Sequence, residues 1–300
     1  MTHEAPYCFA ADLGGTKLAA SMADARGRIV AELTEPTDAR GAAHVAEQIV
    51  ACAGRLSRTV GIEAAQARHV MVGIPGAIDP RTGRVSLTPH IPGLEDFDIL
   101  AFLRKHFGPD AAIDNDVNLA MLGENAFGCA SECRNAAFLA LGTGVGLGLL
   151  IDGKLFRGSC GSAGEIADLP IGSGTLELDV GSPAIVDRYR REGGASTATV
   201  REIFTRLEQG DEVAASVLDT TAQRVALAVA SLQSILDLEL IVFGGSIGVR
   251  PELLERVRRT LPTLFSRPIA IVPSQLGDRA GLVGAAWAAA QALQNSIQSC

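Results

Sequence analysis

A glycine-rich segment, Asp12–Lys17 (DLGGTK), follows a short apolar run and contains the residue types that bind phosphate. Glycines such as Gly14 and Gly15 let the backbone approach a phosphate closely, so that N–H groups and the Thr16 hydroxyl can donate to it. The carboxylate of Asp12 could hold Mg²⁺ through water. The segment has neither the spacing of a Walker loop nor the third glycine of a dinucleotide fingerprint. Taken alone, it also fits a hairpin turn with an acidic cap.

Two further glycine turns follow apolar runs, Gly142-Thr143-Gly144 and Gly244-Gly245-Ser246. One such turn is an ordinary way to end a strand. Three of them at the ends of apolar strands favour a nucleotide bound over glycine backbone.

Carboxylates gather in two places. Asp114–Asn118 (DNDVN) lies between a short predicted strand and a predicted helix. One of its polar residues is expected to cap the helix, and a carboxylate fixed there could accept a proton from a substrate hydroxyl. Glu165, Asp168 and Glu177 lie in a stretch without Lys or Arg. Carboxylates of this kind accept hydrogen bonds from vicinal sugar hydroxyls, although a solvated acidic surface would look the same.

The elements predicted around these residues alternate in type. Apolar runs predict strands at 7–12, 17–22, 29–33, 69–74, 111–113, 136–141, 145–151 and 240–243. Helical spacing of apolar residues predicts helices at 42–56, 99–107, 117–126, 200–209, 212–237, 251–260 and 281–293. This alternation predicts the α/β class. The strand–glycine turn–strand pattern occurs twice, near residues 12 and 142, which suggests two related halves facing each other across a cleft.

Composition excludes several classes of protein. Of the 300 residues, 47% are hydrophobic and 20% charged, so a disordered chain is excluded. The net charge of −8 disfavours nucleic-acid binding and anionic membranes as partners. The six cysteines are scattered without a C-x-x-C pair, the N-terminus lacks an export signal, and the apolar runs are shorter than the ~20 residues that a bilayer requires. We therefore expect a cytoplasmic protein with reduced thiols.

Together these motifs resemble the ROK family of sugar kinases and repressors. The resemblance covers nearly the whole chain, with segments in order at 12–17 (DLGGTK), 73–79 (GIPGAID), 114–118 (DNDVN), 142–148 (GTGVGLG), 152–158 (DGKLFRG), 163–166 (AGEI), 242–246 (VFGGS) and 281–286 (GLVGAA). It implies a two-domain, actin-like (ribonuclease H-like) α/β sugar kinase fold with an interdomain cleft. The implied domains are 1–117, completed by a C-terminal helix at about 284–300, and 118–283.

The resemblance also implies roles for individual residues. Asp116 resembles the catalytic base of the family. The residues expected to contact the sugar are Gly76, His90, Asn115, Asp116, Glu165, Asp168 and Glu177. The residues expected to bind ATP are Asp12, Gly14, Gly15, Thr16 and Lys17 in a first phosphate loop, Gly142, Thr143 and Gly144 in a second, and Gly244 and Gly245 on the adenosine side.

Three departures from the family pattern concern the sugar side. Family members commonly read G-E-I-G-H, with a histidine that binds sugar and zinc, where this chain has Gly164–Asp168 (GEIAD). The cysteine-rich zinc loop that follows is absent, since only Leu169–Leu176 precedes Glu177, and we expect no zinc. Many members read P-N-(I/L)-P-G-W where this chain has Pro89–Leu94 (PHIPGL). Asp168 is therefore expected either to accept a bond from a sugar hydroxyl or to brace the shortened loop.

The resemblance implies an enzyme, a sugar kinase that uses ATP and Mg²⁺ to phosphorylate a hexose or N-acetylhexosamine. It also favours a homodimer. The alternative is a sugar-responsive regulatory protein with little or no turnover, which the altered sugar segment would suit. The intact Asp12, Lys17 and Asp116 favour the enzyme. A DNA-binding repressor is not expected, because eleven residues before Asp12 are too few for a helix-turn-helix domain.

Overall fold

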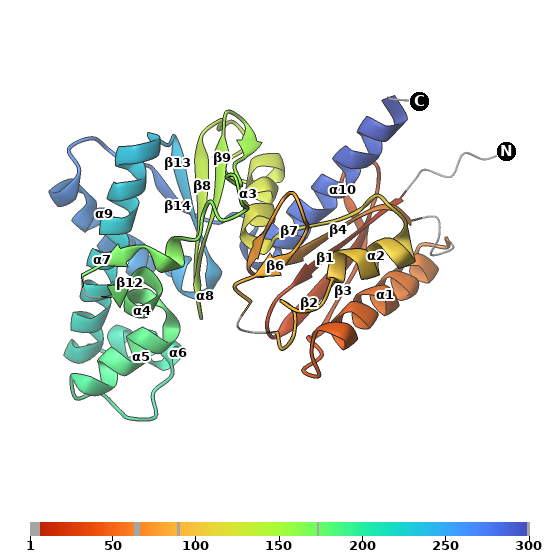
Figure 1. The fold of residues 1–300 in the computed structure, drawn as a ribbon. Helices are drawn as coiled ribbons and strands as arrows, with labels where there is room; N and C mark the ends of the chain where they lie inside the picture. Colours follow the sequence, from red (N-terminus) through yellow and green to blue (C-terminus); the bar gives the residue numbers. More distant parts are fainter. Residues whose placement is uncertain (1–6, 63–66, 89–90, 173, 299–300) are drawn as a thin grey trace. The chain divides into compact units, whose positions relative to one another are not determined.

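The structure is a computed structural model that describes residues 7–62, 67–88, 91–172 and 174–298. The chain forms two compact units, each built on one five-stranded sheet (Figure 1). Unit 1 comprises Met1–Ser131, Leu155–Ala163 and Arg279–Cys300, and unit 2 comprises Glu132–Lys154 and Gly164–Asp278. The expected division after residue 117 differs from this one. The helix that follows residue 115 packs against the C-terminal helix and therefore stays in unit 1.

The sheet of unit 1 has the strand order β3-β2-β1-β4-β7. Its strands are β1 (Tyr7–Leu13), β2 (Lys17–Ala23), β3 (Ile29–Pro36), β4 (Ala67–Ile74) and β7 (Ala111–Asn115). The first three strands pair antiparallel, whereas β4 is parallel to both β1 and β7. A small second sheet pairs β5 (Ala77–Ile78) with β6 (Val85–Ser86). The helices are α1 (Ala42–Thr59), α2 (Ile99–Phe107), α3 (Asp116–Phe127) and α10 (Ala280–Gln298).

Both faces of this sheet are covered, so unit 1 has three layers. Along β1, Phe9, Ala11 and Leu13 belong to the core beneath α1 and α2. The intervening Ala10 packs with residues of α3 and α10 on the opposite face. A strand buried on both faces must be apolar at nearly every position, and this explains the continuous apolar run that leads to Asp12.

Unit 2 repeats this arrangement with the strand order β10-β9-β8-β13-β14. Its strands are β8 (Ala136–Leu141), β9 (Val145–Ile151), β10 (Lys154–Leu155), β13 (Leu240–Gly244) and β14 (Ile271–Pro273). As in unit 1, the first strand pairs antiparallel with its successor, across a glycine turn, and parallel with a later strand. The repeated pattern expected near residues 12 and 142 is therefore confirmed.

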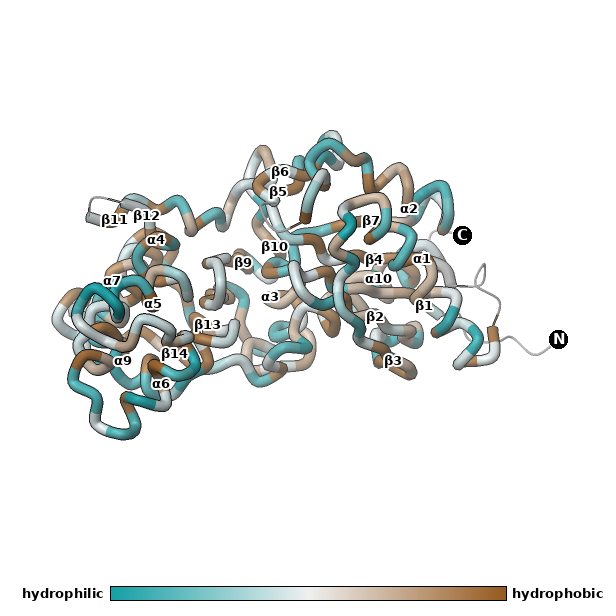
Figure 2. Tube along the Cα trace, turned by 90° about the horizontal axis from the view of Figure 1, so that it is seen from below, coloured by the Kyte–Doolittle hydropathy of each residue, from teal (hydrophilic) through white to brown (hydrophobic). Residues whose placement is uncertain are grey.

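Helices and a short hairpin complete unit 2. They are the 3-10 turn η2 (Ile166–Asp168), the hairpin β11 (Pro170–Ile171) and β12 (Gly174–Thr175), and the helices α4 (Leu176–Val180), α5 (Ser182–Arg191), α6 (Val200–Glu208), α7 (Glu212–Leu236), α8 (Gly245–Gly248) and α9 (Pro251–Leu264); η3 (Gly277–Arg279) precedes α10. Helix α9 is amphipathic, and Figure 2 shows both hydrophilic and hydrophobic residues in this part of unit 2. Its buried residues are Leu253, Leu254, Val257 and Leu261.

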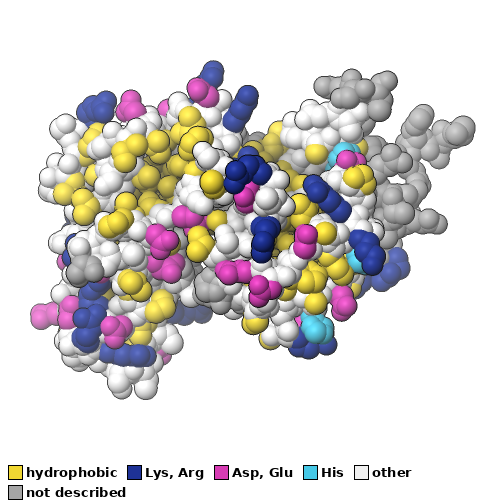
Figure 3. Space-filling view, viewed as in Figure 1, with side chains coloured by type: hydrophobic (Ala, Val, Ile, Leu, Met, Phe, Trp, Pro, Cys, Tyr) yellow, Lys and Arg dark blue, Asp and Glu magenta, His cyan; other side chains and the backbone are white. Residues whose placement is uncertain are grey.

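The predicted elements all have counterparts in the structure, and the α/β fold is confirmed. The sequence reasoning missed several elements, among them α4, α5 and β14, because α4 and β14 are only five and three residues long and α5 is strongly polar. No helix in the described ranges combines the length and apolarity needed to cross a membrane. On the face shown in Figure 3, Lys and Arg side chains are dispersed among Asp and Glu.

The contact between α3 and α10 depends on glycine. A Cβ on Gly284 would lie 1.8 Å from the carbonyl oxygen of Leu119, and a Cβ on Gly123 would lie 2.4 Å from that of Ala280. Either side chain would therefore force the two helices apart.

We expect Gly284→Ala to destabilise the protein by about 1–3 kcal/mol or more, as overpacking does. Gly54→Ala is the matched control, because the nearest atom to its added Cβ, the Nη1 of Arg58, is 3.8 Å away. This control should gain about 0.5–1 kcal/mol from helix propensity. Urea unfolding of both variants tests the contrast, and equal midpoints would contradict the tight helix contact.

Candidate active site

The carboxyl ends of three parallel strands bring the acidic motifs of unit 1 together. In the β1–β4 pair Asp12 lies opposite Gly73, and in the β4–β7 pair Gly73 lies opposite Asp114. In open α/β sheets, ligands bind outside the carboxyl ends of the strands. Two of the predicted motifs, DLGGTK and DNDVN, therefore meet with the GIPG segment at the edge where a ligand would be expected.

The first glycine turn joins β1 to β2. The N–H of Gly14 donates to the carbonyl of Lys17 at 2.9 Å. The Thr37 hydroxyl donates to the carbonyl of Gly14 at 2.7 Å, and the Thr37 N–H donates to the carbonyl of Thr16 at 3.1 Å. Gly15 and Thr16 remain exposed at the tip. Thr37, which sequence reasoning did not single out, thus binds two carbonyl groups of the turn and does not cover the exposed residues Gly15 and Thr16.

The carboxylate of Asp12 lies in a space kept open by two glycines. A Cβ on Gly281 would be 2.6 Å from Oδ2 of Asp12, and a Cβ on Gly73 would be 3.3 Å from Oδ1. Any side chain at Gly281 would displace the carboxylate. Carboxylate oxygens are the ligands that Mg²⁺ prefers, and the ion usually keeps several of its waters. The half-buried carboxylate of Asp12 is a ligand of the type that such a hydrated ion takes.

Asn115 connects the start of α3 to the turn after β4. Its Oδ1 accepts from the N–H groups of Val117 and Asn118 at 2.9 and 3.0 Å, which makes it the N-cap of the helix. Its Nδ2 donates to the carbonyl of Gly76 at 3.0 Å. Gly76 has φ of +103°, and a Cβ there would lie 2.3 Å from the carbonyl oxygen of Ser86. Only glycine fits this position, so the turn presents its carbonyl to Asn115.

Asp114 is buried and neutralised by Arg157. Oδ2 of Asp114 accepts from Nε of Arg157 at 2.9 Å and also from Nη2. Oδ1 accepts from the N–H of Asn115 at 2.8 Å and from Nδ2 of Asn118 at 3.2 Å. Arg157 belongs to the segment Leu155–Ala163, which is part of unit 1. Sequence reasoning gave Arg157 no role; its place in the DGKLFRG motif was the available signal.

Asp116 has a different environment from Asp114. It is the first residue of α3, and its Oδ1 accepts from the N–H of Val117 at 2.9 Å. Burial raises the pKa of Asp116 to about 6, although backbone hydrogen bonds, including that from Val117, act in the opposite direction. Across the part of the chain that is described, no Lys or Arg forms an ion pair with it. A carboxylate with a pKa near neutrality and no cationic partner has the properties of a general base.

Unit 2 brings the other two glycine turns together. β8 and β13 are parallel, so their carboxyl ends lie at the same edge of the sheet. A Cβ on Gly142 would be 3.7 Å from the hydroxyl oxygen of Ser246. Gly245 has φ of +75°, and a Cβ on Gly244 would overlap the ring of Phe138. The two turns are therefore neighbours, and close packing requires glycine at positions 244 and 245, whereas a Cβ at position 142 would make only ordinary contact.

The predicted sugar ligand Glu177 lies against one of these turns. Its Oε2 accepts from the N–H of Val145 at 2.9 Å, and a Cβ on Gly144 would be 2.7 Å from the same oxygen. The carboxylate therefore binds Val145, the residue directly after the turn Gly142–Gly144, which is called the GTG turn below. This contact was not expected from the sequence.

Glu165 and Asp168 flank the short turn η2, of which Glu165 is the N-cap residue and Asp168 the last residue. Asp168 is exposed, and its carboxylate makes no hydrogen bond to any described residue. The hairpin β11–β12 follows and is closed by a 2.9 Å bond from the N–H of Leu176 to the carbonyl of Leu169. The described part of the loop is thus held by its own backbone.

His90 lies outside the described residues. Where side chains are described, no group of three or more His, Cys, Asp and Glu could hold a metal ion.

Comparisons with known proteins agree with this architecture. The sequence pattern of the ROK family matches residues 8–292. A glucokinase from Thermotoga maritima is 28% identical over 305 residues, which cover 92% of this chain and 94% of that protein. A ROK hexokinase from Thermus thermophilus has a TM-score of 0.81 at 30% identity, covering 96% and 99% of the two chains. A ROK family glucokinase from Streptomyces griseus, solved in complex with glucose and AMPPNP, has a TM-score of 0.79 at 26% identity, covering 95% and 99%.

The family match spans both units and includes every glycine turn and carboxylate described above. The fold is likewise that of the ROK sugar kinases, which is actin-like. The chain belongs to the ROK family.

Proposed function

We propose that this protein is a sugar kinase that transfers the γ-phosphoryl group of ATP to a hydroxyl of a hexose or N-acetylhexosamine. Its relatives over more than nine-tenths of the chain include a glucokinase and a ROK hexokinase. The observation that carries the proposal is the environment of Asp116. Its pKa is raised to about 6 and no Lys or Arg among the described residues forms an ion pair with it, which favours a role as proton acceptor.

Asp116 accepts the proton of the attacking hydroxyl as the oxygen bonds to the γ-phosphorus, and ADP leaves with the bridging oxygen. Asp12 would hold Mg²⁺ through water, and the ion would neutralise charge on the phosphates. We assign the backbone of Gly14–Lys17, the GTG turn and Gly244–Gly245 to the phosphates and adenosine. Phosphoryl transfer needs little covalent chemistry from the protein, so positioning of the two substrates carries most of the catalysis.

The sugar side is assigned to Gly76, His90, Asn115, Glu165, Asp168 and Glu177. Oδ1 of Asn115 is used by the helix cap, which leaves the second N–H of Nδ2 for a sugar oxygen. Oε2 of Glu177 is used by Val145, which leaves Oε1 for a hydroxyl. We propose that these contacts operate without zinc, because no cysteine stands between Asp168 and Glu177. The homodimer remains a prediction.

A coupled assay of ADP release, with glucose, mannose, galactose and their N-acetylamino derivatives, tests the proposal. ADP release that depends on one of these sugars is expected. If calorimetry detects sugar binding but no sugar supports ADP release, the regulatory alternative replaces the kinase.

Asp116→Asn should lower kcat by at least ~100-fold, the lower range for loss of a positioned base. The amide can still accept the bond from Val117, so the fold should be kept. Asp110→Asn, an exposed carboxylate just before β7, is the control and should behave as wild type. Wild-type turnover by purified Asp116→Asn would remove this residue from the mechanism.

The raised pKa of Asp116 predicts two effects of pH. First, kcat/KM should fall by about tenfold per pH unit below about pH 6, as the base becomes protonated.

Second, the native state binds this proton more tightly than the unfolded chain, in which the carboxyl has its ordinary pKa of 3.8. Burial of the charge therefore lowers stability as pH rises from 3.8 to 6, and the loss is complete above that interval. Asp116→Asn should raise Tm at pH 8 and leave it nearly unchanged at pH 3.5; the reverse order would contradict the shift.

Asp168→Ala should lower kcat/KM for the sugar by roughly 10- to 150-fold, the effect of losing a hydrogen bond to a charged group. KM for ATP and Tm should stay close to wild type, because the carboxylate bonds no described residue. Glu255→Ala, another exposed carboxylate of unit 2, controls for the change of net charge. A lower Tm with unaltered sugar kinetics would make Asp168 a brace of the loop instead.

A further inference from the structure

The short helix α4 needs an external support. It has five residues, and isolated helices of fewer than about 12–15 residues are marginal in water. Its Leu176 and Val180 are buried in the core of unit 2. Its Glu177 carries the carboxylate that holds Val145 after the GTG turn. Whatever fixes α4 therefore also fixes Glu177.

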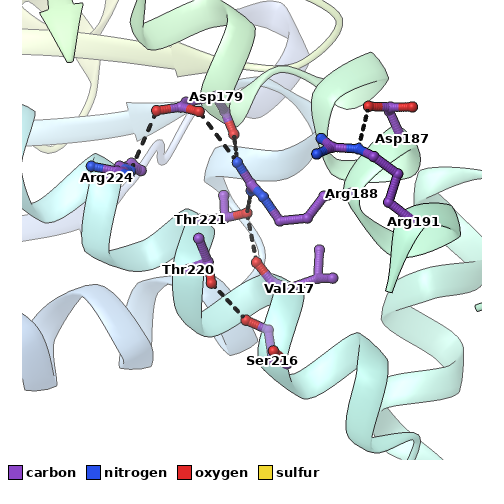
Figure 4. A network of polar contacts seen from close by, with 9 residues as sticks. All are labelled: Asp179, Asp187, Arg188, Arg191, Ser216, Val217, Thr220, Thr221 and Arg224. Carbon is purple, nitrogen blue, oxygen red and sulfur yellow. Dashed lines mark hydrogen bonds and ion pairs between the residues drawn. The ribbon is translucent and has the colours of Figure 1, made fainter. Parts of the chain in front are cut away.

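Two arginines from other helices hold Asp179 of α4 (Figure 4). Nη2 of Arg188, on α5, donates to the backbone carbonyl of Asp179 at 3.1 Å and to its Oδ1 at 3.3 Å. Nε of Arg224, on α7, lies 3.3 Å from Oδ2. Only 13% of the Arg188 side chain is exposed, so this ion pair is screened less than a surface pair.

Arg188 also reaches the long helix α7. Its Nη1 donates to the hydroxyl of Thr221 at 3.3 Å, and this hydroxyl donates to the carbonyl of Val217 at 2.9 Å (Figure 4). Thr221 is fully buried within a helix whose inner face forms the core of unit 2. The guanidinium of Arg188 thus connects α4 and α5 to the long helix α7, whose buried residues belong to the core of unit 2.

The segment from Leu176 to Ser182, hereafter the α4–α5 corner, holds the GTG turn at both ends. Glu177 accepts from Val145 just after the turn. At the first residue of the turn, the carbonyl of Gly142 accepts from both the N–H and the hydroxyl of Ser182, at 2.9 and 3.0 Å. A Cβ on Gly181 would lie 2.9 Å from the carbonyl oxygen of Thr143, so the corner also touches the middle of the turn.

We propose that Arg188, with Asp179 and Arg224, is a positioning residue for the GTG turn. Arg188 connects α7 to the α4–α5 corner, and the corner holds the turn through Glu177 and Ser182. The assignment of the turn to the ATP phosphates rests on the proposed function. The connection from α7 through Arg188 to the turn does not rest on the proposed function, because it consists of contacts within unit 2.

The test compares Arg188→Ala with Arg191→Ala. Arg191 is on the same helix and pairs with Asp187, four residues away, but both side chains are well exposed (Figure 4). Hydrogen exchange of peptides covering 142–147 and 176–182 should be faster in Arg188→Ala and unchanged in Arg191→Ala. The Kd for ATP, measured by calorimetry without sugar, should rise by about 10-fold in Arg188→Ala alone, the lower range for loss of a hydrogen bond to a charged group.

Arg188→Lys keeps a positive charge beside Asp179 but lacks the fork that also reaches Thr221, so it should lie between wild type and Arg188→Ala. Arg224→Gln removes one contact with Asp179, so it should increase both hydrogen exchange at 142–147 and the Kd for ATP by less than Arg188→Ala does. If Arg188→Ala does not fold, Arg224→Gln still tests the proposal. Unchanged exchange at 142–147 in these variants would overturn the proposal. Faster exchange with unchanged ATP affinity would overturn the role toward ATP. A wild-type protein without sugar-dependent ADP release would overturn the kinase but leave the exchange result intact.

Discussion

Parallel pairing of β1, β4 and β7 is the constraint on which the candidate site of unit 1 depends. The register places Asp12, Gly73 and Asp114 in one row across the ends of the strands, although about 100 residues of chain separate the first from the last. Backbone hydrogen bonds set this register, and a slip of one residue would turn every side chain to the other face. The glycine at the centre of the row then leaves room for the carboxylate of Asp12.

The DNDVN motif shows how neighbouring carboxylates acquire different properties. Arg157 neutralises the buried Asp114, which becomes a fixed acceptor for Asn115 and Asn118. Asp116, two residues later, is partly buried without such a cation among the described residues, and burial raises its pKa. Their environments therefore differ, because an ion pair neutralises the charge of Asp114 whereas burial disfavours the charged form of Asp116.

The two units repeat one strand order but hold their glycine turns by different means. In unit 1, Thr37 binds two carbonyls of the turn directly. In unit 2, Glu177 and Ser182 bind the turn, and they depend in turn on α4 and α5. A helix of five residues is marginally stable by itself, and ion pairs from Arg188 and Arg224 to Asp179 help to fix α4 against α5 and α7. The two units therefore share a strand order, but different side-chain contacts hold their glycine turns.

The sequence by itself indicated the longer strands and helices in their order, the repeated glycine turns, the family and the motifs proposed to form the site, because periodicity, glycine and short acidic motifs are local signals. It also anticipated a helix cap within DNDVN, which Asn115 provides. Only the tertiary structure assigned Arg157 to Asp114 and both Arg188 and Arg224 to Asp179. It likewise placed Glu177 against Val145. These partners lie 9 to 45 residues apart in the chain. Such pairs form because strand and helix packing brings distant segments together, and no local pattern of residues records that packing.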